Sequence, residues 1–170
     1  MDAPARLVTD SSLEQLARRL RFLGYDVATH HGARLAELFA AAAREGRTVL
    51  TLSSQRPPRA HPAPMFQVPR EDLAEAVRRV AAAHVPATAR WSRCPACNVA
   101  LHSRSAFEAQ GEVPGPVTRM GVPLSSCPQC GRWYWPGSHV ARLTEWFARV
   151  LGPAGGPEAA SPAPDARPDP

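Results

Sequence analysis

The segment CPACN at residues 94–98 and the segment CPQCG at residues 127–131 are near-copies of each other. In each segment a proline follows the first cysteine, where its fixed φ angle starts a tight turn. The residue after the second cysteine is asparagine or glycine, which adopt a left-handed conformation most easily. Two such turns direct four thiolates toward one point, and a tetrahedron of thiolates suits zinc. The predicted zinc ligands are Cys94, Cys97, Cys127 and Cys130.

An insert of 29 residues separates Cys97 from Cys127. Compact paired-cysteine sites have inserts of roughly 15–20 residues, but the entropic cost of loop closure rises only with the logarithm of length. We therefore expect a zinc ribbon whose insert forms irregular loops or a short hairpin. Four thiolates leave no open position for water, so this Zn²⁺ is expected to be structural and to stabilise the fold.

The composition limits the classes of function. The chain has 170 residues and a formal net charge of +5, a basic balance that is compatible with binding to phosphates. No segment resembles a signal peptide or is apolar enough to span a bilayer, so we expect a cytoplasmic protein without a membrane partner, in which cysteines favour metal over disulfides. The isolated glycines form no phosphate-binding loop, so no nucleotide cofactor is expected. The oligomeric state is not indicated.

Strand-like and helical patterns alternate over residues 1–85. The connections are too long for hairpins, so this unit is predicted to be an α/β domain with a parallel sheet flanked by helices on both faces. The predicted strands are 6–10, 25–29, 48–51 and 65–68, and the predicted helices are 12–23, 34–44 and 69–84.

The remaining chain divides into two further parts. Residues 86–151 are predicted to form the zinc ribbon and a final helix, because Val140, Leu143 and Phe147 recur at helical spacing. Residues 152–170 are mostly proline, alanine and glycine without apolar periodicity, so we expect a disordered tail.

Two carboxylates are candidates for one edge of the predicted sheet. Asp10 follows the first strand, and Glu37 lies one turn into the second helix. Function in parallel sheets lies beyond the carboxyl ends of the strands. Converging carboxylates there would hold a divalent cation that orients water for phosphodiester attack, and Asp26 is a further acidic group to consider. The alternative is that Asp10 caps the first helix and Glu37 is solvated.

Three arginines on the first helix, Arg18, Arg19 and Arg21, lie mostly outside its apolar stripe. A run of charge on a helix is typical of a solvated face. A phosphate-binding edge is the alternative, and salt-dependent binding would distinguish the two.

Four blocks of sequence, in this order, resemble the Mut-seven C-terminal RNase domain family, which has a PIN-like nuclease fold followed by a zinc ribbon. The blocks are residues 7–10, 16–26, 44–51 and 127–139, and the resemblance covers about residues 6–150. It implies a metal-dependent ribonuclease that uses Mg²⁺ or Mn²⁺ and acts on RNA. The family's strand-end carboxylate corresponds to Asp10, and its acidic pair in the second helix corresponds to Ala36 and Glu37.

The chain departs from this family at the end of the third strand. The family's Thr-Arg-Asp appears here as Thr51, Leu52 and Ser53, so one carboxylate is missing. Because affinity for a hard cation depends on the number of carboxylates, metal binding should weaken. The proline-rich residues 56–64 cannot form the helix expected next. Two hypotheses remain, a ribonuclease with a degenerate metal site and a non-catalytic RNA-binding relative.

Aromatic residues follow the second cysteine pair. Trp133 and Trp135 share one face of a predicted strand and lie beside Arg132. Such a group stacks on unpaired bases in single-stranded RNA-binding proteins, so these three residues are candidate RNA contacts. The alternative is that both tryptophans cover the thin core of a small metal module.

Overall fold

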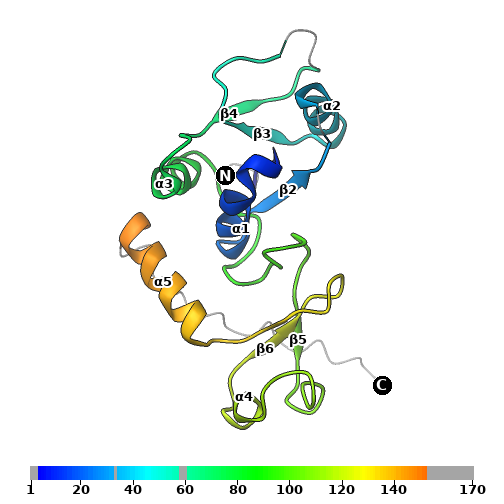
Figure 1. The fold of residues 1–170 in the computed structure, drawn as a ribbon, viewed down its shortest axis with the longest axis vertical. Coiled ribbons are helices and arrows are strands. Elements are labelled where there is room, and N and C mark those ends of the chain that lie inside the picture. The colour runs from blue at the N-terminus through cyan, green and yellow to red at the C-terminus, as the bar shows by residue number, and fades with distance from the viewer. Residues whose placement is uncertain (1–3, 33, 58–60, 153–170) are drawn as a thin grey trace.

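The computed structural model describes residues 4–32, 34–57 and 61–152, and it confirms the predicted α/β architecture (Figure 1). The strands β1 (Arg6–Asp10), β2 (Asp26–His30), β3 (Thr48–Thr51) and β4 (Met65–Gln67) form a parallel sheet in the order β2-β1-β3-β4. β2 is therefore an edge strand. The predicted disordered tail falls almost wholly on residues 153–170, which lie outside the described residues.

Helices cover both faces of this sheet, as the alternation of elements predicted. A 3₁₀ turn, η1 (Ser11–Leu13), leads into α1 (Glu14–Phe22), which packs with α3 (Leu73–Ala83) on the face that carries Leu7 and Leu50. The opposite face, with Val8 and Val49, is covered by α2 (Leu35–Glu45). No helix within the described ranges is long and apolar enough to cross a membrane.

The ribbon is a second, smaller body. It contains the antiparallel strands β5 (His102–Arg104), β6 (Leu124–Ser126) and β7 (Trp133–Tyr134), with the short helix α4 (Gly115–Arg119) in the insert. Its own core is small, and its buried members are Ala109, Val113 and Leu124. A core of this size gives little stability without a metal or another support.

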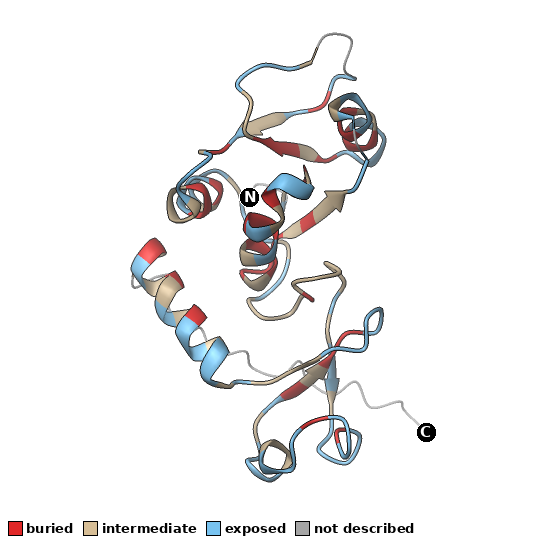
Figure 2. Ribbon diagram, in the orientation of Figure 1, coloured by how far each residue is buried: buried red, intermediate tan, exposed pale blue. Residues whose placement is uncertain are grey.

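The last helix, α5 (Ser138–Leu151), returns from the ribbon to the α/β body and lies beside α3 (Figures 1 and 2). Its buried residues Leu143, Phe147 and Val150 belong to the same hydrophobic cluster as α1 and α3. The chain therefore uses a segment C-terminal to the ribbon to complete the core of its N-terminal half.

Arg21 corrects the expectation for the arginine run on α1. Arg18 is exposed as predicted, but Arg21 is only 1% exposed and is among the largest fully buried side chains. Its guanidinium forms an ion pair of 3.3 Å with Glu14 and donates to the Thr29 hydroxyl at 2.6 Å. Burial alone lowers the pKa of Arg21, and the neighbouring Glu14 counteracts this.

Candidate functional site

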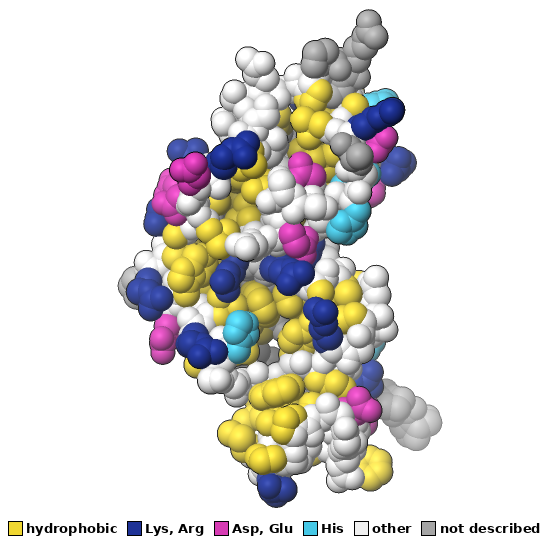
Figure 3. Space-filling model, in the orientation of Figure 1, with side chains coloured by type: hydrophobic (Ala, Val, Ile, Leu, Met, Phe, Trp, Pro, Cys, Tyr) yellow, Lys and Arg dark blue, Asp and Glu magenta, His cyan; other side chains and the backbone are white. Residues whose placement is uncertain are grey.

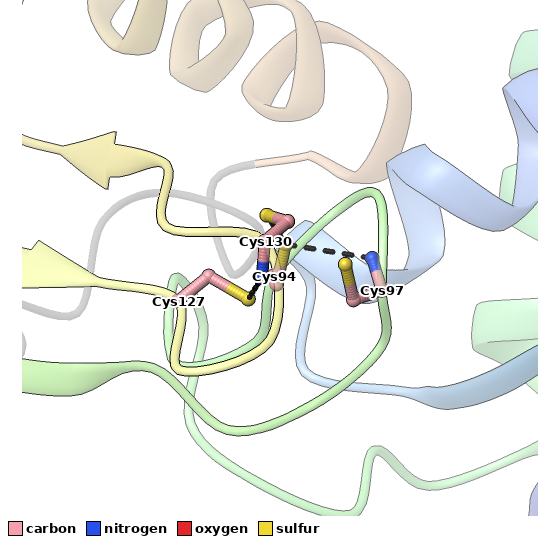
Figure 4. A group of neighbouring side chains, drawn as sticks. All are labelled: Cys94, Cys97, Cys127 and Cys130. Atoms are coloured by element: carbon pink, nitrogen blue, oxygen red, sulfur yellow. Dashed lines mark hydrogen bonds between the residues drawn. The ribbon is translucent and has the colours of Figure 1, made fainter.

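The four cysteines lie where the first knuckle (residues 94–98) faces the second knuckle (residues 127–131), and their sulfurs turn toward one another (Figure 4). All four Sγ atoms lie within 4.8 Å of one another, and none is in a disulfide. The Sγ atoms of Cys94 and Cys130 are 3.8 Å apart. A tetrahedron with Zn–S bonds of about 2.3 Å has an edge of about 3.8 Å, so spacing and donor chemistry fit a metal ion such as Zn²⁺.

Hydrogen bonds to the Cys94 sulfur favour its thiolate form, which is the form that binds a cation. The Cys97 N–H donates to Cys94 Sγ at 3.4 Å, and the Tyr134 hydroxyl lies 3.2 Å from the same sulfur. Burial alone would raise the pKa of Cys94, but the bonds from Tyr134 and Cys97 lower that pKa to about 7. Burial and neighbouring sulfurs raise the pKa of Cys97 to about 12. Thiolates this close together repel one another, and a bound divalent cation would offset that repulsion.

Asp10, the predicted strand-end carboxylate, is the last residue of β1 and caps the following turn. Its Oδ1 atom accepts from the backbone N–H of Ser12 at 2.8 Å and also from the Ser12 hydroxyl. The structure thus gives Asp10 the capping contact that the sequence offered as the alternative to metal binding.

Glu37, the second predicted carboxylate, lies in the first turn of α2 beside His30. His30 is paired with Asp10 in parallel register, so both side chains leave the sheet on the α2 face. The His30 Nε2 and Glu37 Oε2 atoms lie 2.3 and 2.7 Å from the point where a Cβ atom would stand at Gly32. Any larger residue at position 32 would displace the side chains of His30 and Glu37. The His30 Nε2 atom is buried without a hydrogen-bond partner among the described residues.

A third carboxylate is missing from this strand-end rim. Ser53, at the position where the resemblance implies an aspartate, uses its hydroxyl within its own turn, accepting from the Gln55 N–H at 3.1 Å and donating to the Gln55 carbonyl at 2.9 Å. Asp26 is the first residue of β2, at the opposite end of the strands from the rim, and it accepts from Arg47 at 2.8 Å. Across residues 4–32, 34–57 and 61–152, the cysteines form the only group of three or more Cys, His, Asp or Glu ligand atoms within 4.8 Å. Among the described residues, the rim therefore contains no group of three ligand atoms like that formed by the cysteines.

The predicted RNA-contact residues lie on the ribbon. Arg132 is exposed, whereas Trp133 and Trp135 are partly buried against the ribbon core. Tyr134 points the other way, toward Cys94. Both tryptophans therefore support the ribbon, and each also leaves part of its surface accessible.

A hollow of about 410 Å³ opens between η1 and the start of α3. Its charged lining residues are one arginine, Arg70, and two carboxylates, Glu14 and Glu71. This mixture gives the hollow no preference for an anionic ligand.

Sequence reasoning missed the contacts between the first knuckle and the sheet. Arg21 donates to the carbonyl oxygen of Pro95 at 2.7 Å, and Asn98 donates to the carboxylate of Asp26 at 2.7 Å. These partners are 74 and 72 positions apart in sequence. The available signal was an arginine adjoining the apolar stripe of α1, which is ambiguous without the fold.

One family model matches this chain. The Mut7-C RNAse domain model covers residues 5–147 of the 170. The chain belongs to the Mut7-C RNAse domain family. Membership confirms the resemblance drawn from the sequence blocks, and it supports a nuclease-like, RNA-related role. No curated protein and no solved structure matches the chain.

Proposed function

We propose that this member of the Mut7-C RNAse domain family binds RNA without cleaving it. The observation that carries the proposal is the composition of the strand-end rim. Asp10 caps η1, Ser53 stands where the family resemblance implies a carboxylate, and Asp26 lies at the opposite end of the strands. A hard cation needs several oxygen ligands, so a rim with this few converging carboxylates is a poor site for Mg²⁺ or Mn²⁺.

The ribbon and α5 supply the basic surface for RNA. Residues 86–151 carry seven arginines and three acidic residues. Figure 3 shows basic side chains gathered around the waist of the molecule, between the α/β body and the ribbon. Arg132, exposed beside Trp133 and Trp135, combines a cation with aromatic surface. Phosphate contacts from arginine and stacking on aromatic rings are the two terms that bind single strands without sequence preference.

RNA affinity measured over a salt series tests this proposal. We expect binding to single-stranded RNA to weaken as salt rises, and Arg132→Gln to reduce the salt slope by about 0.7, as for one lost phosphate contact. Arg44→Gln, an equally charge-neutralising change on α2 with a side chain 73% exposed, is the matched control and should leave the slope unchanged. Affinity that is independent of salt, or no detectable binding to RNA, would refute the proposal.

The aromatic contribution needs a separate measurement of stability. Stacking on one base contributes about 1–3 kcal/mol, so a tryptophan that contacts RNA should cost about 5-fold or more in affinity when replaced by alanine. Trp133→Ala and Trp135→Ala are each compared by RNA affinity and by thermal unfolding. A loss of stability with unchanged affinity would assign that tryptophan to the ribbon core alone.

A second candidate function, a ribonuclease with a thinned metal site, is favoured by one observation. The unpartnered Nε2 of His30 and the carboxylate of Glu37 both border Gly32, on the face where Asp10 also leaves the sheet. Imidazole nitrogen and carboxylate oxygen are both ligands for Mn²⁺. A cleavage assay on single-stranded and structured RNA, with Mg²⁺ or Mn²⁺, decides between the two functions. Metal-dependent cleavage that Asp10→Ala and Glu37→Ala abolish would replace the binding proposal.

A further inference from the structure

The two knuckles differ at the residue that ends each turn. Asn98 and Gly131 have almost the same backbone conformation, with φ angles of 65° and 71°. Glycine adopts this left-handed conformation without a steric penalty, and asparagine adopts it more easily than most other residues. The second knuckle shows that glycine is sufficient for the turn itself. The turn therefore does not require the side chain of Asn98, which is available for other contacts.

That side chain reaches the edge of the parallel sheet. The Asn98 Oδ1 atom accepts from the backbone N–H of Val27 at 3.1 Å, and its Nδ2 atom donates to Asp26 at 2.7 Å. Val27 is fully buried and is the second residue of β2, the edge strand. A buried N–H without a partner is unfavourable, so Asn98 takes the place that a fifth strand would otherwise fill.

Arg21 satisfies the other backbone group of the same residue. Its Nε atom donates to the Val27 carbonyl oxygen at 2.8 Å. Its Nη1 atom donates to the carbonyl oxygens of Pro95 and Ala96, between the first two cysteines, at 2.7 and 3.3 Å. The Val27 N–H is thus hydrogen-bonded to Asn98 of the first knuckle, and the Val27 carbonyl is hydrogen-bonded to Arg21, which itself donates to that knuckle.

We propose that the first knuckle, held in shape by its metal, closes the open edge of the α/β sheet at Val27, so that metal occupancy governs the local opening of β2. Cys94 and Cys97 fix the loop that carries the carbonyls of Pro95 and Ala96 and the amide of Asn98. When the metal leaves, these partners are no longer held in place against β2. The exposed edge is then free to exchange its amide protons and to pair with another chain.

Amide hydrogen exchange of the full chain, followed residue by residue by NMR, tests this coupling. In the zinc-loaded protein we expect Asn98→Gly to accelerate exchange at Val27 on the order of tenfold, as for one lost hydrogen bond, while amides of β3 are unchanged. Gly131→Asn is the matched control, since no atom lies within 4 Å of the added Cβ, and it should leave Val27 unchanged. Equal exchange at Val27 in the wild type and in Asn98→Gly would overturn the proposal.

Chelation of zinc provides the second arm. Removal of zinc from the wild type should accelerate exchange in β2 more than in β3, and the further acceleration at Val27 should be smaller in Asn98→Gly, because the edge is already uncapped. If Asn98→Gly is poorly folded, Arg21→Lys replaces it in the experiment. Lysine cannot reach the two knuckle carbonyls and Val27 together, so exchange at Val27 should again be faster while amides of β3 are unchanged. Uniform loss of protection across β1, β2 and β3 on chelation would show global unfolding and would contradict a coupling specific to the edge.

Discussion

The cysteine cluster and the strand-end rim are both assembled from distant parts of the chain, yet they differ in completeness. The cluster brings all four predicted ligands within 4.8 Å. At the rim, Asp10 is engaged with Ser12, Glu37 lies beside His30, and Ser53 bonds within its own turn. Each knuckle is a short turn that directs its two sulfurs locally, whereas the rim depends on separate elements each supplying one carboxylate. The cysteine cluster therefore has all of its predicted ligands in place, whereas the rim has too few converging carboxylates.

The largest expected effect comes from removing one ligand of the cysteine cluster. We expect Cys94→Ser to abolish metal binding and to unfold the ribbon, because metal binding at such sites contributes on the order of 10 kcal/mol to folding. Metal content by mass spectrometry and thermal unfolding measure this. Ser103→Ala, at an exposed position on β5, should behave as wild type. A full equivalent of zinc in Cys94→Ser would remove the cluster as the metal site.

The next effect sharpens the link between the cluster and the sheet. Arg21→Met should lower the free energy of unfolding by about 3–5 kcal/mol, because it leaves the carbonyl oxygens of Val27 and Pro95 without their donor and removes the buried partner of Glu14. Arg18→Met removes an exposed partner of the same Glu14 and should cost about 0.5 kcal/mol. Urea unfolding compares the two variants. Equal losses would mean that burial of Arg21 contributes nothing.

A smaller effect is expected at the strand-end rim, from the removal of the Asp10 carboxylate. Asp10→Ala should lower the free energy of unfolding by about 1 kcal/mol, the usual contribution of a helix cap. Asp72→Ala is the matched control, since Asp72 caps α3 by accepting from the Glu75 N–H at 2.8 Å. Similar losses support a capping role for both. Asp10→Ala with unchanged or increased stability would instead indicate a carboxylate retained for function at the expense of stability.

The smallest effect is a pH dependence at Asp26, between the sheet and the first knuckle. Burial alone would raise the pKa of Asp26, but hydrogen bonds from Arg47 and Asn98 bring that pKa below its usual value. The ionised form thus stabilises the fold above the unfolded-state pKa of about 4, and this stabilisation is lost as pH falls toward the lowered folded-state pKa. The free energy of unfolding, measured over acid pH at matched metal content, should change less steeply with pH in Asp26→Asn than in the wild type. Parallel curves would contradict this assignment.

Much of the architecture was predictable because its signals are local. Strands at residues 6–10 and 48–51 appear as predicted, and the second strand and second helix are displaced by one residue. The third helix begins at Leu73 rather than at residue 69, because Asp72 caps it there. The sequence gives no signal that His30 lies beside Asp10, because the two residues are on separate strands. The register of His30 with Asp10 exists only in the assembled sheet.

The sequence by itself determined the two cysteine knuckles, and the resemblance to the family placed Ser53 where an aspartate is expected, because turn chemistry and residue identity are properties of short segments. Tertiary structure alone decided that Arg21 is buried, that Asn98 caps Val27, and that Asp26 lies away from the rim. Each of these facts depends on hydrogen-bond partners or strand ends that are far apart in the chain. The burial of a charged or polar side chain is favourable only where such partners meet, and that place is defined by packing of the whole fold.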